Sequence, residues 1–298
     1  VESCRHLDNA MSKQLIGIAS SYLKKHPSAM QSILEAIGDD KKAFNYEAAW
    51  ITKLRNKWAR ALHTSDVEPT RTEDCSTPIR GGLLKAWAKA ARDPALAVVG
   101  WLFRGAPAGI MHEVPLLGVF PPKDPDETIT VDDLESSYDE PDDNYSSLED
   151  DAEADDLIKN ITDADKCWVH VASTWQDAVD YLGGAPIVSQ LGLVVEEKKD
   201  ASGKVIGVEK RLILDARRSR ANNLALAAQR IVLPRPTDAV DDVLVLQDHA
   251  AKAGTDEDVE QLVADYVDAY WLMLLAKVER RCQVAKCQGT YLIFLRTG

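Results

Sequence analysis

The chain lacks the features of a membrane-anchored, disulfide-stabilised or zinc-binding protein. Its apolar runs, of which residues 95–103 form one, fall short of the roughly eighteen residues that a membrane-spanning helix needs. No signal-peptide pattern opens the sequence. The few cysteines include no C-x-x-C pair and no Cys/His set at zinc spacing. We therefore expect reduced thiols in an intracellular protein, cytoplasmic or nuclear, with no membrane partner.

Charge is distributed unevenly along the chain. The net charge is −13, which taken alone argues against a nucleic-acid partner. Residues 121–156, however, hold sixteen Asp or Glu residues and a single lysine, so the remainder is close to neutral. Residues 198–235 hold ten Lys or Arg against three acidic residues. We expect the acidity to belong to a linker and the basic segment to face nucleic acid.

Composition and periodicity predict an α+β fold in three parts. Residues 1–120 carry apolar side chains at helical spacing and predict a helical region of unknown role. Residues 121–156 combine proline, serine and acidic residues with few apolar ones, which predicts an acidic disordered linker. Residues 157–298 alternate strands, helices and hairpins.

One expected helix in the first part carries a row of interleaved basic residues: Lys53, Arg55, Lys57 and Arg60. Such a row is found on helices that face nucleic acid and also on ordinary solvated faces. We expect the solvated face here.

The most informative stretch is residues 264–271, Ala-Asp-Tyr-Val-Asp-Ala-Tyr-Trp. Asp265 and Asp268 lie three residues apart, directly after an apolar pair that is expected to end a strand, and Tyr270 follows two positions later. A carboxylate at a strand end can hold two Mg²⁺ ions about 4 Å apart, as two-metal phosphoryl transfer requires. The alternative is that both Asp residues only serve a turn or a helix cap.

Three other segments accompany this stretch in a fixed order. Residues 198–217 pair a basic strand with an Arg-x-x-x-Asp-x-Arg strand, residues 233–236 read Leu-Pro-Arg-Pro, and residues 291–298 read Tyr-Leu-Ile-Phe-Leu-Arg-Thr-Gly. Together the four segments resemble the fingers hairpin, the x-Pro-x-Pro link, motif A and the strand into motif B of retroelement reverse transcriptases. The resemblance covers roughly residues 190–298 and implies the fingers and partial palm of a right-hand polymerase.

The resemblance assigns the metal and the sugar to the motif A segment. Asp265 would be the catalytic ligand of two Mg²⁺ ions, and Tyr266 would lend its backbone carbonyl. Asp268 and Ala269 would meet the triphosphate, Asp268 through its backbone amide. Tyr270 would be the ring that blocks a ribose 2′-hydroxyl, the alternative being a core ring at a strand–helix junction.

The resemblance also assigns the phosphates and the template to the hairpin. Arg211, at a fixed distance from Asp215, and Lys198 would clamp the incoming triphosphate, with Lys199 an alternative to Lys198. Asp215 and Arg217 would contact the template, the alternative for Arg217 being a solvated edge or an ion pair with Asp215.

The sequence departs from the family at several points. Ala216 stands where a bulky residue is usual, and Arg-Thr-Gly at residues 296–298 replaces a Pro-Gln-Gly-like turn. Motif C, the Tyr-x-Asp-Asp hairpin with the other metal-binding carboxylates, is absent, as are RNase H and integrase patterns. We therefore expect a polyprotein fragment that is inactive by itself.

The implied partners are a template RNA or DNA with its primer, and deoxynucleoside triphosphates. Two alternatives stay open. The chain could be a non-catalytic retroelement remnant that at most binds nucleic acid, or a helical interaction module.

Overall fold

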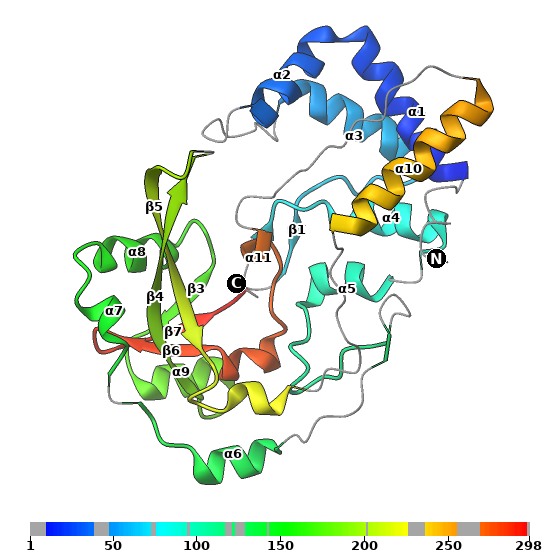
Figure 1. Ribbon diagram of the computed structural model, residues 1–298. Coiled ribbons are helices and arrows are strands. Elements are labelled where there is room, and N and C mark those ends of the chain that lie inside the picture. The colour runs from blue at the N-terminus through cyan, green and yellow to red at the C-terminus, as the bar shows by residue number, and fades with distance from the viewer. Residues whose placement is uncertain are drawn as a thin grey trace.

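The protein has an α+β fold (Figure 1). The computed structural model describes residues 10–38, 48–72, 76–93, 96–116, 121–122, 129–141, 143–200, 202–225, 236–254 and 269–296. The first five helices and a two-stranded ladder make up the N-terminal part: α1 (Ala10–Lys25), α2 (Pro27–Gly38), α3 (Ala49–Ala61), β1 (Thr70–Arg71), β2 (Ser76–Thr77), α4 (Gly81–Ala91) and α5 (Leu96–Arg104).

The helices expected in the N-terminal part are confirmed. Pro27 begins α2, where a missing backbone N–H costs nothing. Helices α1, α3 and α4 share a small core that includes Leu15, Ala59 and Leu83. The Trp58 indole N–H donates to the Leu15 carbonyl at 3.1 Å, which fixes α3 against α1. None of the described helices has the length and apolar composition needed to cross a membrane.

A five-stranded mixed sheet forms the second part, in the order β3-β7-β6-β4-β5. Its strands are β3 (Val169–Ala172), β4 (Val188–Lys199), β5 (Val205–Asp215), β6 (Val284–Cys287) and β7 (Thr290–Phe294). Strands β4 and β6 run parallel, and the other neighbouring pairs run antiparallel. Around the sheet lie α6 (Val131–Ser137), α7 (Ser146–Glu149), α8 (Ala154–Ile161), α9 (Trp175–Leu182), α11 (Ala269–Leu272), and the 3₁₀ helices η2 (Ala221–Leu224) and η3 (Lys277–Cys282).

Alternating residues send side chains to the two faces of this sheet. On β7, Leu292 and Phe294 join a core with α7 and α8, whereas Tyr291 and Ile293 join a core with Ala178 of α9. Both faces of β7 are therefore covered. The inner half of β4, residues 188–193, is buried, and its outer half, residues 194–199, is exposed. Strand β5 follows it outward, so that the two strands project as one long twisted ribbon (Figure 1).

Most elements expected between residues 174 and 295 are confirmed. Thr174 caps α9 with a full capping box through Asp177, and Gly183 ends that helix in the left-handed region. The β4–β5 hairpin and the β6–β7 hairpin, which turns at Gln288 and Gly289, both form. Helix α10 (Pro236–Ala253) forms as well. Residues 233–235 of the Leu-Pro-Arg-Pro segment and the expected strand at 262–263 lie outside the described residues, and the last residue of that segment, Pro236, begins α10.

The acidic stretch differs from the expected disordered linker. Its described residues contain α6, α7 and the start of α8, and Leu134 and Leu148 are 0% and 3% exposed. The phenol of Tyr138 accepts from the Val188 backbone N–H at 2.8 Å and donates to the Val188 carbonyl at 3.1 Å. A few well-spaced apolar and aromatic residues thus anchor a stretch whose average composition is that of a disordered segment.

The same stretch also closes the edge of β4 beyond its short pairing with β6. Asn144 accepts from the Leu191 N–H through its side chain at 2.9 Å, and Tyr145 donates its own N–H to the Leu191 carbonyl at 2.9 Å. The Ser147 hydroxyl accepts from the Leu193 N–H at 3.1 Å. These bonds satisfy backbone groups that a neighbouring strand would otherwise have to meet.

Candidate functional site

The register of the β4–β5 hairpin brings the expected phosphate and template residues onto one face. Lys198 lies opposite Gly207, Val194 opposite Arg211, and Gln190 opposite Asp215. Because side chains alternate along each strand, Lys198, Arg211 and Asp215 share a face. Lys198 and Arg211 lie on the exposed outer half, and Asp215 lies about 13 Å further along, where β5 ends.

Both basic residues are engaged by carboxylates on this face. Lys198 Nζ lies 2.9 Å from Glu209 Oε2, Arg211 Nε lies 3.0 Å from Glu209 Oε1, and Arg211 Nη2 lies 3.3 Å from Glu196 Oε2. Hydrogen bonds from Arg211 and Lys198 lower the pKa of Glu209 to about 2. The basic window of the sequence begins at Lys198 and so omits Glu196, which the register places directly across from Glu209 and within reach of Arg211. The hairpin face is therefore close to neutral.

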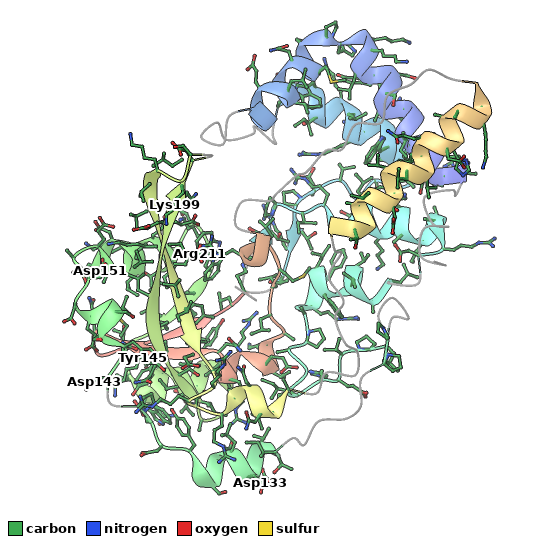
Figure 2. All side chains as sticks on the ribbon, viewed as in Figure 1. Asp133, Asp143, Tyr145, Asp151, Lys199 and Arg211 are labelled. Carbon is green, nitrogen blue, oxygen red and sulfur yellow. The ribbon has the colours of Figure 1, made fainter. Side chains whose placement is uncertain are left out.

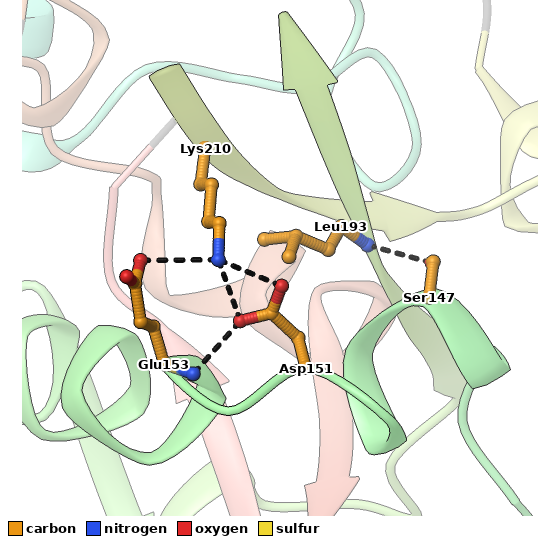
Figure 3. Close-up of polar contacts among 5 residues, drawn as sticks. All are labelled: Ser147, Asp151, Glu153, Leu193 and Lys210. Carbon is orange, nitrogen blue, oxygen red and sulfur yellow. Dashed lines mark hydrogen bonds and ion pairs between the residues drawn. The ribbon is translucent and has the colours of Figure 1, made fainter. Parts of the chain in front are cut away.

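The opposite face of the hairpin is tied to the acidic stretch. Lys210 Nζ lies 2.8 Å from Asp151 Oδ2 and 3.0 Å from Glu153 Oε2, and Asp151 also accepts from the Glu153 N–H (Figure 3). The hydrogen bond from Lys210 holds the pKa of Asp151 below its usual value. Figure 2 shows Asp151 and Arg211 on either side of the hairpin. The acidic stretch, expected to be a linker, thus contacts the basic hairpin directly through these residues.

Asp215 is held by a residue to which no sequence pattern points. The Tyr145 hydroxyl donates to Asp215 Oδ2 at 2.6 Å, and the Arg217 backbone N–H donates to Oδ1 at 2.9 Å. Both bonds lower the pKa of Asp215, and the first raises the pKa of Tyr145. Gly192 allows this approach, since a Cβ there would lie 3.1 Å from the Tyr145 ring. The expected template contact of Asp215 stays a prediction, with its carboxylate oriented by Tyr145; the Arg217 side chain is exposed.

A cavity of about 240 Å³ opens at the base of the hairpin beside Asp215. The Arg218 guanidinium donates to Gln190 Oε1 at 2.9 Å in its wall. Residues of the acidic stretch and of the turn after β5 line the cavity: Leu134, Tyr138, Asp139, Glu140, Pro141, Gln190, Arg218, Ser219 and Arg220. Carboxylates and guanidinium groups are both present, so the cavity has no dominant charge.

Much of the expected catalytic segment lies outside the described residues. Asp265, Tyr266 and Asp268 fall there, and the structure does not test their roles. Ala269 and Tyr270 begin α11. Trp271 stacks on Trp168 with ring centroids 4.6 Å apart. Trp271 is therefore a core ring, and the sugar-blocking role of Tyr270 stays a prediction.

Arg296, noted as a departure from the family turn, is a buried structural residue. It is 2% exposed and donates to the carbonyls of Ser76 at 2.8 Å, Cys167 at 3.2 Å and Leu272 at 3.4 Å. A single guanidinium thus joins the N-terminal part, the residue before Trp168 and the end of α11. The segment that follows the expected metal-binding strand is held in place in this way.

Glu279 of η3 makes a second such link. It is 0% exposed, and its carboxylate accepts from the backbone N–H groups of Met111 and His112, each at 3.0 Å. The N-terminal part and the sheet are therefore joined by buried, hydrogen-bonded charges.

No metal site is evident in the part of the chain that the structure describes, where no group of three or more His, Cys, Asp or Glu residues could hold an ion. The expected ligand Asp265 lies outside that part. In the comparisons with known proteins, no family model, no curated protein and no solved structure matches the chain.

Proposed function

We propose that the chain is the fingers and partial palm of a retroelement RNA-directed DNA polymerase, which transfers nucleotides by two-metal catalysis in the complete element. The observation that carries the proposal is the β4–β5 hairpin. It places Lys198 and Arg211 together on an exposed face, with Asp215 at the strand end on that same face. This is the arrangement that a triphosphate clamp beside a template contact requires.

The carboxylates on this face are compatible with phosphate binding. The side chains of Lys198 and Arg211 are 63% and 56% exposed. Ion pairs between such exposed groups contribute about 0–1 kcal/mol each. A triphosphate carries several negative charges and accepts paired hydrogen bonds from a guanidinium, so it would compete effectively for Arg211.

The catalytic step is proposed to use the motif A segment. Asp265 and the Tyr266 carbonyl would ligate Mg²⁺, which stabilises the attacking 3′-oxygen and the leaving pyrophosphate. Asp268 and Ala269 would meet the triphosphate, and Tyr270 would exclude the ribose 2′-hydroxyl. The further carboxylates of a Tyr-x-Asp-Asp hairpin are absent from these 298 residues. The chain by itself is therefore expected to bind nucleotides without incorporating them.

Nucleotide binding by the chain tests the proposal. We expect dGTP with Mg²⁺ to bind, and Arg211→Gln to weaken binding on the order of tenfold, as loss of a hydrogen bond to a charged group does. Lys204→Gln, which removes the same charge in the turn of the same hairpin, is the matched control and should have little effect. Isothermal titration calorimetry gives both dissociation constants.

Two results would contradict the proposal. Absence of dGTP binding would favour the non-catalytic remnant. Equal losses for Arg211→Gln and Lys204→Gln would mean that only net charge matters and that the hairpin has no clamp.

A further inference from the structure

A groove of about 420 Å³ lies between α1 and α3. Its α1 residues fall on one helical face because they recur at intervals of three, four and seven. The groove is lined by Gln14, Gly17, Ile18, Ser21, Tyr22, Lys25, His26 and Lys57. We call it the α1–α3 groove.

The two helices that form the groove carry charge of one sign. Neither α1 nor α3 contains an Asp or Glu residue. Their basic residues are Lys13, Lys24, Lys25, Lys53, Arg55, Lys57 and Arg60. Among the described ion pairs, none involves Lys25, Lys53 or Lys57. Positive charge along a concave surface attracts anions and raises their local concentration.

The basic residues of α3 lie in a row along the helix and are not clustered at one position. Lys53, Lys57 and Arg60 recur at i, i+4 and i+7, so they share one face of α3 and span about 10 Å of its axis. Lys57 of this row lines the groove, as Lys25 does from α1, and Lys53 and Arg60 continue the row on either side of Lys57. A row of this length matches several consecutive phosphates of a nucleic-acid strand better than one isolated phosphate group.

Rings lie beside the row. The centroids of Tyr22 and His26 are 4.2 Å apart, and Lys57 Nζ lies 5.7 Å from the centre of the Tyr22 ring. Tyr22 is buried, whereas His26 is exposed and presents its imidazole to the groove. Flat rings within a basic groove are the elements that bind unpaired bases of single strands.

The groove also has room for a ligand. A Cβ added at Gly17 would meet nothing within 4 Å, so the α1 wall is open at this point. The basic side chains of the β4–β5 hairpin, in contrast, are occupied by neighbouring carboxylates.

We propose that the α1–α3 groove binds single-stranded nucleic acid, with phosphates along the row formed by Lys53, Lys57 and Arg60 and a base beside His26. This site is separate from the polymerase hairpin, and its binding needs neither Mg²⁺ nor a nucleoside triphosphate. The row of basic residues on α3, which the sequence analysis expected to be a solvated face, would then contact the phosphates of the strand. A polymerase fragment with this site would hold its template at two places.

Binding of a fluorescent oligo-U twelve-mer to the full chain tests the proposal by anisotropy in about 50 mM salt. Lys25→Glu with Lys57→Glu is expected to weaken binding on the order of tenfold. The control pair Lys85→Glu with Lys89→Glu makes the same charge change on α4 and should change affinity less than about twofold. In a salt titration with the milder pair Lys25→Gln and Lys57→Gln, the slope should fall by about 0.7 for each phosphate that the protein no longer neutralises.

Substitutions at Gly17 provide a second, independent variant pair. Gly17→Ala adds only a methyl group in open space and favours the helix, so affinity should be unchanged. Gly17→Glu places a carboxylate in the groove and should weaken binding several-fold. Circular dichroism confirms that each variant keeps its helices.

Three outcomes would overturn the proposal. One is an equal loss of affinity for the groove pair and the α4 pair. Another is binding of a duplex of the same length, or of vesicles rich in phosphatidylserine, as tight as binding of the single strand. The third is the same affinity for Gly17→Glu and Gly17→Ala. Failure of dGTP to bind the hairpin would leave this proposal intact, because the assay contains neither nucleotide nor metal.

Discussion

The β4–β5 hairpin and the α1–α3 groove are both rich in lysine and arginine, yet their electrostatics differ. On the hairpin, Lys198 and Arg211 share Glu209, and Lys210 contacts Asp151. In the groove, helices without any carboxylate supply Lys25 and Lys57. A count of basic residues therefore describes the groove well and the hairpin poorly. What decides the surface is whether the fold brings an acidic residue within reach of each cation.

The two regions would accordingly bind anions in different ways. An anion at the hairpin must displace carboxylates, which favours a ligand with strong, directional acceptors such as a triphosphate. At the groove, Lys25 and Lys57 take part in none of the described ion pairs, which favours a polyanion and a steep dependence on salt. The proposed division is a selective site for the nucleotide and a general site for the strand.

The largest expected effect concerns the acidic stretch that supplies Asp151. Leu148 of this stretch is 3% exposed within the core of the sheet, so Leu148→Ala should reduce the free energy of unfolding by about 2–5 kcal/mol. The control is Leu34→Ala on α2, where the side chain is 54% exposed and the change should be within about 0.5 kcal/mol. Urea titrations monitored by circular dichroism give both values. Equal values would show that the acidic stretch is not part of the folded core.

A smaller effect is expected when the hairpin is made to resemble the groove. Glu209→Gln removes the carboxylate shared by Lys198 and Arg211, and should strengthen oligo-U binding several-fold. The background is Lys25→Glu with Lys57→Glu, so that the groove contributes little. Glu197→Gln is the control, because Glu197 contacts only the neighbouring Lys199 among the described ion pairs. An equal gain from both substitutions would mean that net charge alone, and not pairing, sets the difference.

The smallest expected effect is a difference in stability at low pH between the sheet that carries the hairpin and the helices that form the groove. The pKa of Glu209 is lowered from 4.5 to about 2 by Arg211 and Lys198, and the pKa values of Asp151 and Asp215 are also lowered. A carboxylate with a lowered pKa stabilises the fold above its ordinary pKa, and this contribution disappears as the pH falls towards the folded value. The sheet should therefore lose stability between about pH 4.5 and pH 2.

Helices α1 and α3 have no carboxylate to protonate, so their packing should change less over this interval. The indole N–H signals of Trp58 in α3 and Trp168 beside the sheet report the two regions separately by NMR during a pH titration. Simultaneous loss of both signals would show that the regions unfold as one unit, and earlier loss of the Trp58 signal would reverse the comparison.

Local patterns were enough to place many of the elements. The capping box of Thr174 and Asp177, the stop at Gly183 and the turn at Gln288 and Gly289 all depend on residues within four positions of one another. The two strands of the β4–β5 hairpin were expected as well, but it was the family resemblance that implied Lys198 and Arg211 lie near each other; the pairing of β4 with β5 supplies the register. Glu209 lies close to Arg211 in the sequence, but only its position on the same face of β5 shows that it can contact both Lys198 and Arg211.

Long-range contacts explain where sequence reasoning failed. Averaged composition predicted disorder over residues 121–156, because averages ignore that a few positions such as Leu134 and Leu148 suffice to anchor a segment. Arg296 looked like a departure from a motif, and its three carbonyl partners include Ser76, 220 residues away. No short-range signal could reveal these contacts.

Hydrogen bonds and spacing within one or two turns of chain specify the helices, the hairpins and the uniform charge of α1 and α3, and these features can therefore be read from short stretches of residues. Which charges come into contact depends instead on how distant segments pack. Tyr145 reaches Asp215 across 70 residues and Lys210 reaches Asp151 across 59, because the acidic stretch folds back along the edge of β4. The net charge of a surface depends on such contacts between distant residues, and these contacts follow from the path of the chain in space.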